Sequence, residues 1–504
     1  MTSRPSRAVR PRGPAAAPAA PAAPTAPTAA DAAARPARRL TASGRRARRA
    51  LLLPAAVAGA LALAACATGS AADADADAST AATGATGAPG DGHGYVEGAV
   101  ELQEPQLRLV ALSADGALTA FDPATEESVV LADGVEATRL VTDGRYVAAS
   151  ADDGSVTLVD GGAWTVPHGD HSHYYLADPR VVAEPGDLDG GAGAGEARVA
   201  SSASLTAVSF DGSGRGVVLD GEALADGERD ELGRVDDLGA EGVLVPLGGA
   251  VVASVATGDA GEGVADAVQV VTPQGDPVDG ARASCPGLRG ASATRVGVVV
   301  GCSDGALLVT EGEADAGPGG SSGEGEGAGS ASSGSDTADA SDASDGAPAV
   351  TIERIPSPEG TAPADVATSF EQRPGRPALA AVAGTRGAWL LDARARSWTL
   401  VETPEPLLRA TAVGDADDTV VGVDASGRVV VLSPDGLVAQ TEPLLAGDLV
   451  DGALPAGVRL EVDASRSYVA SPATGQVHEI DHADAARVAR SFDLPATLLV
   501  ETGR

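Results

Sequence analysis

Residues 420–432, with the sequence VVGVDASGRVVVL, contain the pattern that decides the fold. Two short apolar runs, Val420–Asp424 and Arg428–Leu432, flank the dipeptide Ser426-Gly427. Glycine at such a position supplies the positive φ that a tight hairpin turn requires, so the stretch predicts two antiparallel strands. The same succession of run, turn and run is found at residues 107–121, 146–159 and 296–310.

The spacing of these runs predicts an all-β protein. After residue 66 the chain has no long stretch with apolar residues at every third or fourth position, the pattern typical of an amphipathic helix. Recurring short strands favour four-stranded blades, and the length allows a β-propeller of seven or eight blades at about 45 residues each. Since aromatic residues make up only 2% of the chain, the cores must consist mainly of Val, Leu and Ala. An array of β-sandwiches is the main alternative.

Charge is distributed unevenly along the 504 residues, whose formal net charge is −36. Residues 1–65 contain 11 Arg and one acidic residue, whereas the remainder contains 24 Arg and 70 acidic residues. So acidic a body excludes binding to nucleic acid through neutralisation of phosphates. It should repel anionic surfaces and attract cations.

An export signal is predicted near the N-terminus. The basic segment Arg45–Arg49 precedes an apolar run, Ala50–Ala65, which is too short for a comfortable membrane span. The run ends in Leu63-Ala64-Ala65-Cys66, which resembles a bacterial lipobox. In proteins with that motif the cysteine is lipidated and becomes the mature N-terminus. We therefore expect a lipid anchor on Cys66 and a body on the extracellular face of the cell membrane; an ordinary signal peptide with an incidental cysteine is the alternative.

Composition divides the rest of the chain. Residues 1–44 are rich in Ala, Pro and Arg and are expected to be a disordered extension before a signal peptide at 45–65. Residues 66–92 are expected to form a flexible tether, and 93–504 the propeller domain. Within that domain, residues 311–349 are acidic, rich in Gly and Ser and without an apolar run, so we expect a disordered insertion.

Histidine is scarce, with six in the whole chain, yet three of the six lie in the segment His168-Gly169-Asp170-His171-Ser172-His173. On a strand His171 and His173 point to the same face. Imidazole nitrogens suit Zn²⁺, and a carboxylate can complete a tetrahedral site. The segment therefore predicts a zinc site with His171 and His173 as ligands, supported by His168 or Asp170. Asp170 could instead orient an imidazole, and an exposed polar loop without metal is the alternative.

The other histidines and the cysteines are weaker signals. His93 and His478 are further metal candidates. The alternative for His93 is a local turn residue, and the alternative for His478 is a residue that forms a hydrogen bond between blades. His482 is expected at the surface.

Cys285 and Cys302 are the only cysteines after Cys66. In an exported protein they are expected to form a disulfide, because disulfides persist outside the cytoplasm and no further cysteine is present to build a metal site.

Several segments resemble the AztD family of secreted zinc metallochaperones. They are 93–99 (HGYVEGA), 168–175 (HGDHSHYY), 285–288 (CPGL), 301–305 (GCSDG), and the tail from His478 through Arg487 to residues 501–504 (ETGR). The resemblance implies a β-propeller that is not an enzyme, binds zinc, and passes it to the solute-binding protein of a zinc ABC importer. It also implies that the metal ligands lie in the 168–173 segment.

One residue departs from that family pattern. In that family a histidine follows Cys-Pro-Gly-Leu, whereas Arg289 follows here. A permanently protonated guanidinium cannot bind a metal, so a ligand would be lost if the family's histidine is one. The alternative function is a metal-free propeller scaffold of the cell envelope. A catalytic role has little support, because Gly212-Ser213-Gly214 lacks the spacing of a nucleophile elbow and no phosphate-binding loop precedes a helix.

Overall fold

The computed structural model describes residues 94–168, 171–256, 263–312, 349–367 and 369–504, which belong to one compact unit. These residues are almost entirely β-strand, with one short helix, α1 (Gly221–Ala225), and one 3-10 turn at Pro363–Asp365. No helix in the described ranges is long and apolar enough to cross a membrane. The extension, the signal peptide, the tether and residues 313–348 of the acidic insertion lie outside the described residues.

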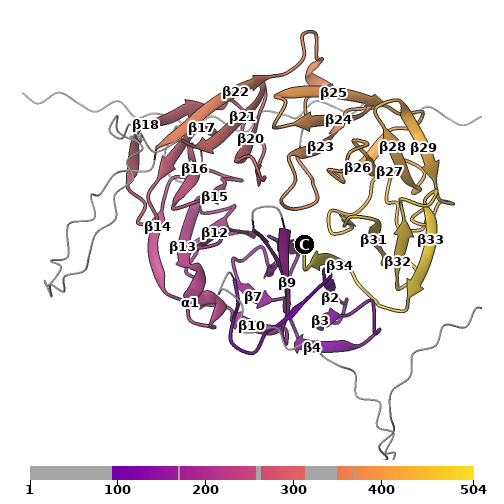
Figure 1. Cartoon of the computed structure of the whole chain (residues 1–504), viewed down its shortest axis with the longest axis horizontal. Coiled ribbons are helices and arrows are strands. Elements are labelled where there is room, and N and C mark those ends of the chain that lie inside the picture. Colours follow the sequence, from indigo (N-terminus) through magenta and orange to yellow (C-terminus); the bar gives the residue numbers. More distant parts are fainter. Residues whose placement is uncertain (1–93, 169–170, 257–262, 313–348, 368) are drawn as a thin grey trace, which may run out of the picture. The chain divides into compact units, whose positions relative to one another are not determined.

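Eight antiparallel sheets, which we number as blades, follow one another along the described chain (Figure 1). Blades 1 to 4 consist of β34 (Leu498–Thr502), β2 (Arg108–Leu112), β3 (Leu118–Phe121) and β4 (Ser128–Ala132); β5 (Arg139–Thr142), β6 (Tyr146–Ser150), β7 (Val156–Asp160) and β10 (Arg180–Ala183); β11 (Ala197–Ser201), β12 (Leu205–Phe210), β13 (Arg215–Asp220) and β14 (Glu231–Val235); and β15 (Leu244–Leu247), β16 (Ala250–Ala256), β17 (Ala265–Val271) and β18 (Pro277–Ser284).

Blades 5 to 8 continue the series. They consist of β19 (Ala291–Ala293), β20 (Val298–Cys302), β21 (Gly305–Glu311) and β22 (Val350–Pro356); β23 (Ala378–Ala383), β24 (Gly387–Asp392) and β25 (Ser397–Glu402); β26 (Leu407–Ala412), β27 (Val420–Asp424), β28 (Val429–Ser433) and β29 (Gly436–Gln440); and β30 (Leu460–Val462), β31 (Arg466–Ser471), β32 (Gln476–Asp481) and β33 (Arg487–Phe492). In blade 6 the innermost position is held by a single bridge, Glu371 to Ala380.

The packing between blades closes the ring. Buried clusters of mainly Val, Leu and Ala fill the space between each pair of consecutive blades, as expected from the scarcity of aromatic residues. The last of these clusters joins blade 8 to blade 1, where Tyr468 packs with Leu109 and Leu499. Blade 1 itself pairs β34 with β2, Val500 opposite Val110, so the two ends of the propeller share one sheet. The predicted β-propeller is confirmed, with eight blades in the described residues.

Glycine turns account for the hairpins as the sequence indicates. In blade 7 the pair Val423 and Val429 closes the β27–β28 hairpin, and Gly427 adopts a φ of 80° in its turn. A Cβ at Gly427 would lie 2.7 Å from the backbone of Leu445, so both the backbone angle and the space require glycine here.

The disulfide and the edges of the acidic insertion are also defined. Cys285 and Cys302 form the expected disulfide, with 5.0 Å between their Cα atoms, and connect the end of blade 4 to blade 5. At the insertion, strand β21 includes Glu311, and the Gly312 N–H donates to the Ala349 carbonyl at 2.6 Å. The two sides of the insertion therefore lie next to each other on one hairpin.

Candidate metal centre

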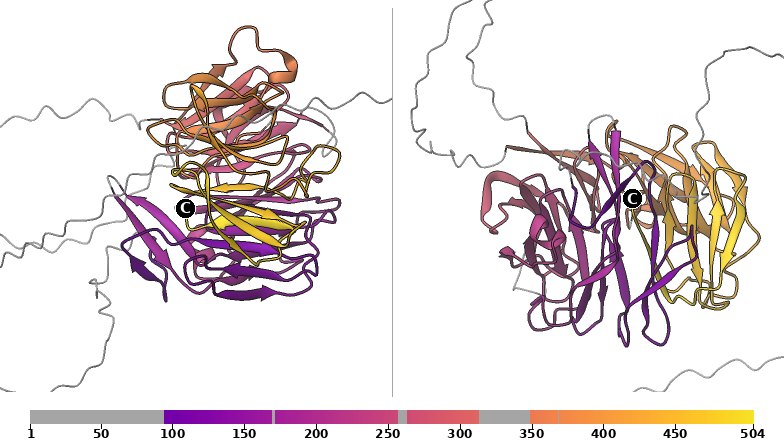
Figure 2. Two further views of the ribbon diagram at one scale, coloured as in Figure 1. Left: turned by 90° about the vertical axis from the view of Figure 1, so that its right-hand side faces the viewer. Right: turned by 60° about the horizontal axis from the view of Figure 1, so that its bottom comes forward.

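A ninth sheet, separate from the eight blades, carries the histidine segment. Strands β8 (Ala163–His168) and β9 (His171–Leu176) form a hairpin inserted between β7 and β10 of blade 2, and β1 (Val100–Leu102) pairs with β9 on the other side. Figure 2 shows these indigo and purple strands projecting from one face of the ring. We call this three-stranded sheet the hairpin sheet.

The hairpin sheet gathers its functional side chains on one face. Residues two apart on a strand share a face, and so do residues directly opposite on neighbouring strands. His171, His173 and Tyr175 therefore share a face along β9. Glu101 of β1 and Trp164 of β8 are both paired with Tyr175 and extend the same face.

The two imidazoles of β9 lie next to each other, as the sequence predicts. Their ring centroids are 4.9 Å apart and their planes meet at 64°. Two nitrogens that bind one tetrahedral zinc ion, each at about 2.0–2.1 Å, lie roughly 3.4 Å apart. Neighbouring rings on one strand face can provide such a pair. His171 is exposed, whereas His173 is partly buried and its Nε2 atom is shielded from solvent, so solvent reaches the pair from the side of His171.

Glu101 fixes the orientation of one of these rings. The His173 Nδ1 atom lies 2.7 Å from Glu101 Oε1. A carboxylate at Nδ1 favours the tautomer with the proton on Nδ1, which makes Nε2 the electron-pair donor of the ring. Metal-binding histidines in proteins usually have such a carboxylate or carbonyl partner. Sequence analysis missed Glu101, although its place in an apolar strand close behind the Gly94–Gly98 segment was a signal.

An aromatic stack supports the base of the hairpin. Tyr175 stacks on Trp164 with 5.4 Å between ring centroids, and His173 lies parallel to Tyr175 at 6.3 Å. The Arg145 guanidinium carbon lies 3.9 Å from the centroid of Trp164, and the Trp164 indole N–H donates to the Gly94 carbonyl at 3.1 Å. Burial raises the pKa of Tyr175, with a smaller contribution from Glu101 in the same direction. These contacts hold the β9 backbone in place beneath the histidines.

The remaining members of the predicted site are only partly described. The register places the backbone of His168 opposite His171, across a turn whose residues 169–170 lie outside the described residues. Asp170 and His93 therefore cannot be placed, and neither can the proposed lipidation site Cys66. In the part of the chain that is described, no three histidine, cysteine or carboxylate side chains form a group able to hold a metal.

His478 and His482 belong to blade 8 rather than to the hairpin sheet. His478 is 6% exposed and its Nδ1 lies 2.9 Å from the Ser491 hydroxyl on the neighbouring strand. His482 is also 6% exposed, with Nδ1 2.9 Å from the Ser467 hydroxyl. The expectation of a surface position for His482 is wrong, because the loop after β32 folds it against β31. Burial lowers the pKa of both rings, which keeps them neutral.

Arg289 also lies away from the hairpin sheet. It precedes β19 in blade 5 and lines the central cavity of the propeller together with Arg139 of blade 2. The substitution of arginine at this place in the sequence therefore changes the channel wall and not the His171–His173 pair.

Comparison with known proteins supports the architecture. No protein-family model matches the chain. Two crystal structures of AztD from Citrobacter koseri, one of them of the apo protein, superpose with a TM-score of 0.59. In both cases the sequence identity is 17% and the superposition covers 79% of this chain and 98% of AztD. The chain thus has an AztD-like propeller fold over nearly the whole length of that protein.

Proposed function

We propose that this protein is an extracytoplasmic zinc-binding metallochaperone. The observation that supports it best is the pair of neighbouring imidazoles, His171 and His173, with Glu101 at the back of one ring on a sheet that projects from the propeller. Binding and release of a metal ion, rather than catalysis, is the proposed activity. The AztD-like fold and the resemblance in segment 168–175 favour zinc over other metals.

The proposed zinc ion is cargo and not a structural part of the protein. His171 and His173 provide two nitrogen ligands in this proposal, and His168 or Asp170, which are close to them in the sequence, would provide a third. A site that keeps one position for water or for a partner's side chain can release its metal, whereas a closed four-ligand site is typically structural. An exposed His171 at the end of a hairpin suits direct transfer.

The recipient and the location are part of the same proposal. We propose that the recipient is the solute-binding protein of a zinc ABC importer, and that a lipid on Cys66 holds the propeller at the extracellular face of the membrane. A body with 70 acidic residues after residue 65 would also concentrate cations near its surface.

Titration of metal-free protein with Zn²⁺ tests the proposal. We expect wild-type protein to bind close to one equivalent tightly, and the variant His171→Ala/His173→Ala to bind at least 100-fold more weakly with unchanged circular dichroism. Ser172→Ala is the matched control, because Ser172 lies between the two histidines but points to the opposite face of β9. A wild-type protein that binds no zinc at micromolar concentration would favour the metal-free scaffold, and a tightly binding double variant would place zinc elsewhere.

A further inference from the structure

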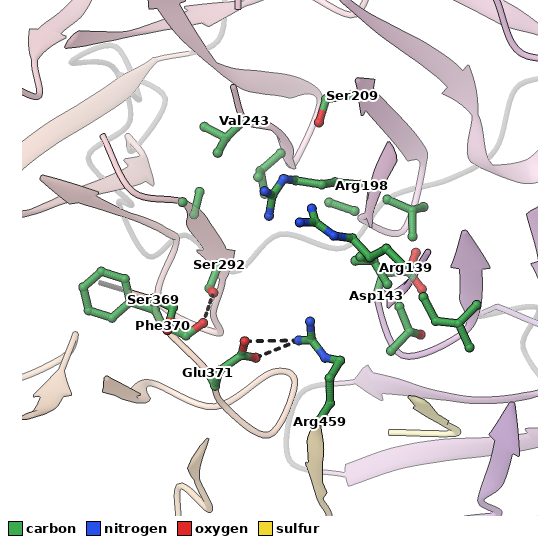
Figure 3. Close-up of a pocket in the computed structure, with 18 of the residues that line it drawn as sticks. Arg139, Asp143, Arg198, Ser209, Val243, Ser292, Ser369, Phe370, Glu371 and Arg459 are labelled. Carbon is green, nitrogen blue, oxygen red and sulfur yellow. Dashed lines mark hydrogen bonds and ion pairs between the residues drawn. The ribbon is translucent and has the colours of Figure 1, made fainter. Parts of the chain in front are cut away.

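The central cavity of the propeller is a second candidate site, independent of the hairpin sheet. It has a volume of about 420 Å³ and is lined by residues from the innermost part of several blades. Its charged lining consists of four arginines and three acidic residues, a higher share of arginine than in the whole chain, whose net charge is −36. Figure 3 shows Arg139 and Arg198 entering from one side, with Arg459 and Glu371 below them.

The arginines share one end of the channel because of the topology. Innermost strands of a propeller run in the same direction around the axis, so their first residues lie at the same end. Arg139 is the first residue of β5, Arg198 is the second of β11, and Arg459 immediately precedes β30. Arg289 lies two residues before β19. Four blades therefore each place an arginine at the same end of the cavity.

The hairpin sheet belongs to the opposite end. It leaves blade 2 after Asp160, the last residue of β7. Asp160 is paired with Tyr146, which follows the end of β5 after a short turn. The histidines are thus attached where β5 ends and the arginines lie where it begins.

Ion pairs hold three of the four arginines in position. Asp211 receives two bonds from Arg198, at 2.8 and 2.9 Å, and one from Arg139 at 2.9 Å. Arg139 also pairs with Glu196 at 2.7 Å. The two guanidiniums share Asp211, and neither is fully occupied as a donor, because each arginine carries five N–H groups.

The other two arginines differ from each other. Arg459 donates through one nitrogen to both oxygens of Glu371, at 3.1 and 3.2 Å. Arg289 is exposed and has no carboxylate partner among the described residues. The carboxylates at this end, Asp211, Glu196 and Glu371, form ion pairs with the other three arginines. Arg289 therefore adds one positive charge that no carboxylate among the described residues balances.

The disulfide holds the segment that carries Arg289. Cys285 is bonded to Cys302, and the N–H of Ser303 donates to the Pro286 carbonyl at 2.7 Å. Further along, the Arg289 N–H donates to Gly301 at 2.9 Å, so the segment is attached to β20 at both ends. These contacts fix the backbone from which the Arg289 side chain extends, which lowers the backbone entropy lost when a ligand binds.

We propose that the arginine end of the central cavity binds a small multivalent anion bearing carboxylate or phosphate groups, with Arg289 as its main contact. Planar guanidiniums bind both groups through paired hydrogen bonds. Arg139, Arg198 and Arg459 contribute the donors that their carboxylates leave available. This site stands apart from zinc binding and does not depend on the proposed function.

Calorimetric titration of the mature, metal-free protein with inorganic phosphate and, separately, with citrate tests this site. We expect submillimolar binding of at least one of them, weakened at least tenfold by Arg289→Gln. Arg282→Gln is the matched control, since Arg282 is exposed on β18, outside the cavity lining, and should leave the affinity unchanged. The relative affinity of the two anions identifies the preferred group. His171→Ala/His173→Ala should bind the anion as wild type does.

Two results would overturn the proposal. One is the absence of binding of either anion at millimolar concentration, and the other is an equal effect of Arg289→Gln and Arg282→Gln. Because Arg289 is exposed, its replacement should not unfold the protein, and an unchanged melting temperature verifies this. A Cys285→Ser/Cys302→Ser variant should weaken anion binding while leaving zinc binding intact, because the disulfide holds the segment that carries Arg289 and not the hairpin sheet.

Discussion

Strand β9 of the hairpin sheet and blade 8 each carry two histidines, and the two pairs differ in burial and in contacts. On the hairpin sheet, His171 is exposed and its ring lies 4.9 Å from that of His173. In blade 8, His478 and His482 are each only 6% exposed. The first pair is arranged as ligands would be, whereas the second pair consists of neutral hydrogen-bonding groups within the packed propeller.

The difference shows that spacing alone does not identify a metal site. His478 and His482 lie four residues apart, but His478 is in the middle of β32 and His482 just beyond its end, and each ring bonds to a different serine hydroxyl. A short, two-residue separation on a projecting strand brings rings together without burying them. Substitution of buried polar side chains in blade 8 should therefore change the free energy of unfolding, whereas substitution of side chains on the hairpin sheet should change the affinity for zinc.

The largest effect is expected at the junction of blade 8 with blade 1. Glu501 of β34 is fully buried, its oxygens make no hydrogen bond within the described residues, and its backbone N–H lies 3.3 Å from Glu461 Oε2. Burial raises the pKa of Glu501 from 4.5 to about 8, although Arg504 opposes the shift. Its contribution to stability is therefore complete below pH 4.5 and is lost as the pH rises through about 8.

Glu501→Gln should remove this pH dependence. Between pH 5 and pH 9 the wild-type free energy of unfolding should fall relative to the variant by on the order of 3 kcal/mol. Urea unfolding at a series of pH values measures this, with zinc affinity at pH 7 unchanged. Parallel pH profiles for the two proteins would show that the carboxyl does not stay protonated in the fold.

A smaller effect is expected for Glu101→Gln on the hairpin sheet. The amide still fits beside His173 Nδ1 but no longer carries the negative charge that holds a proton on Nδ1 and leaves the Nε2 lone pair for the metal. Loss of such a partner typically costs 10–100-fold in metal affinity. Zinc titration should show this weakening without a change in melting temperature. Glu104→Gln, on an exposed residue two positions after β1, is the control, and an equal effect of both variants would mean that only general charge matters.

His482 should affect stability at acid pH and leave zinc binding unchanged. Because burial lowers its folded-state pKa below 6.5, the contribution to stability is present above pH 6.5 and is lost as the pH falls below it. One pH unit below that value the wild type should lose up to about 1.4 kcal/mol, a loss absent in His482→Gln. Chemical unfolding at pH 5.5 and 7.5 measures this loss of stability. A lower zinc affinity of the His482→Gln variant would show that blade 8 also contributes to zinc binding, which contradicts the account.

The smallest effect is expected from replacing residues 313–348 with a two-residue turn. Gly312 and Ala349 are already joined by a hydrogen bond of 2.6 Å at the end of the β21–β22 hairpin. A short turn can therefore close it without moving either strand. Scanning calorimetry should give a melting temperature within a few degrees of wild type. A large fall would show that the acidic tract packs on the propeller.

Local features were predictable from the sequence, and long-range ones were not. The hairpins could be predicted from Gly427 and equivalent glycines, because a positive φ is a local requirement of the turn. The shared face of His171 and His173 could be predicted because the two residues lie two positions apart on one strand. The contact of Glu101 with His173 spans 72 residues and depends on β1 joining a sheet outside the blades. The burial of His482 likewise depends on β31 covering it, which no local pattern indicates.

Diffraction from crystals of the zinc-loaded protein, measured at energies on either side of the zinc absorption edge, tests the central claim most directly. The account predicts an anomalous peak between the imidazoles of His171 and His173, with two nitrogen ligands at about 2.0–2.1 Å. A peak confined to blade 8 or to the central cavity, or none on the hairpin sheet in protein shown to contain zinc, would contradict it.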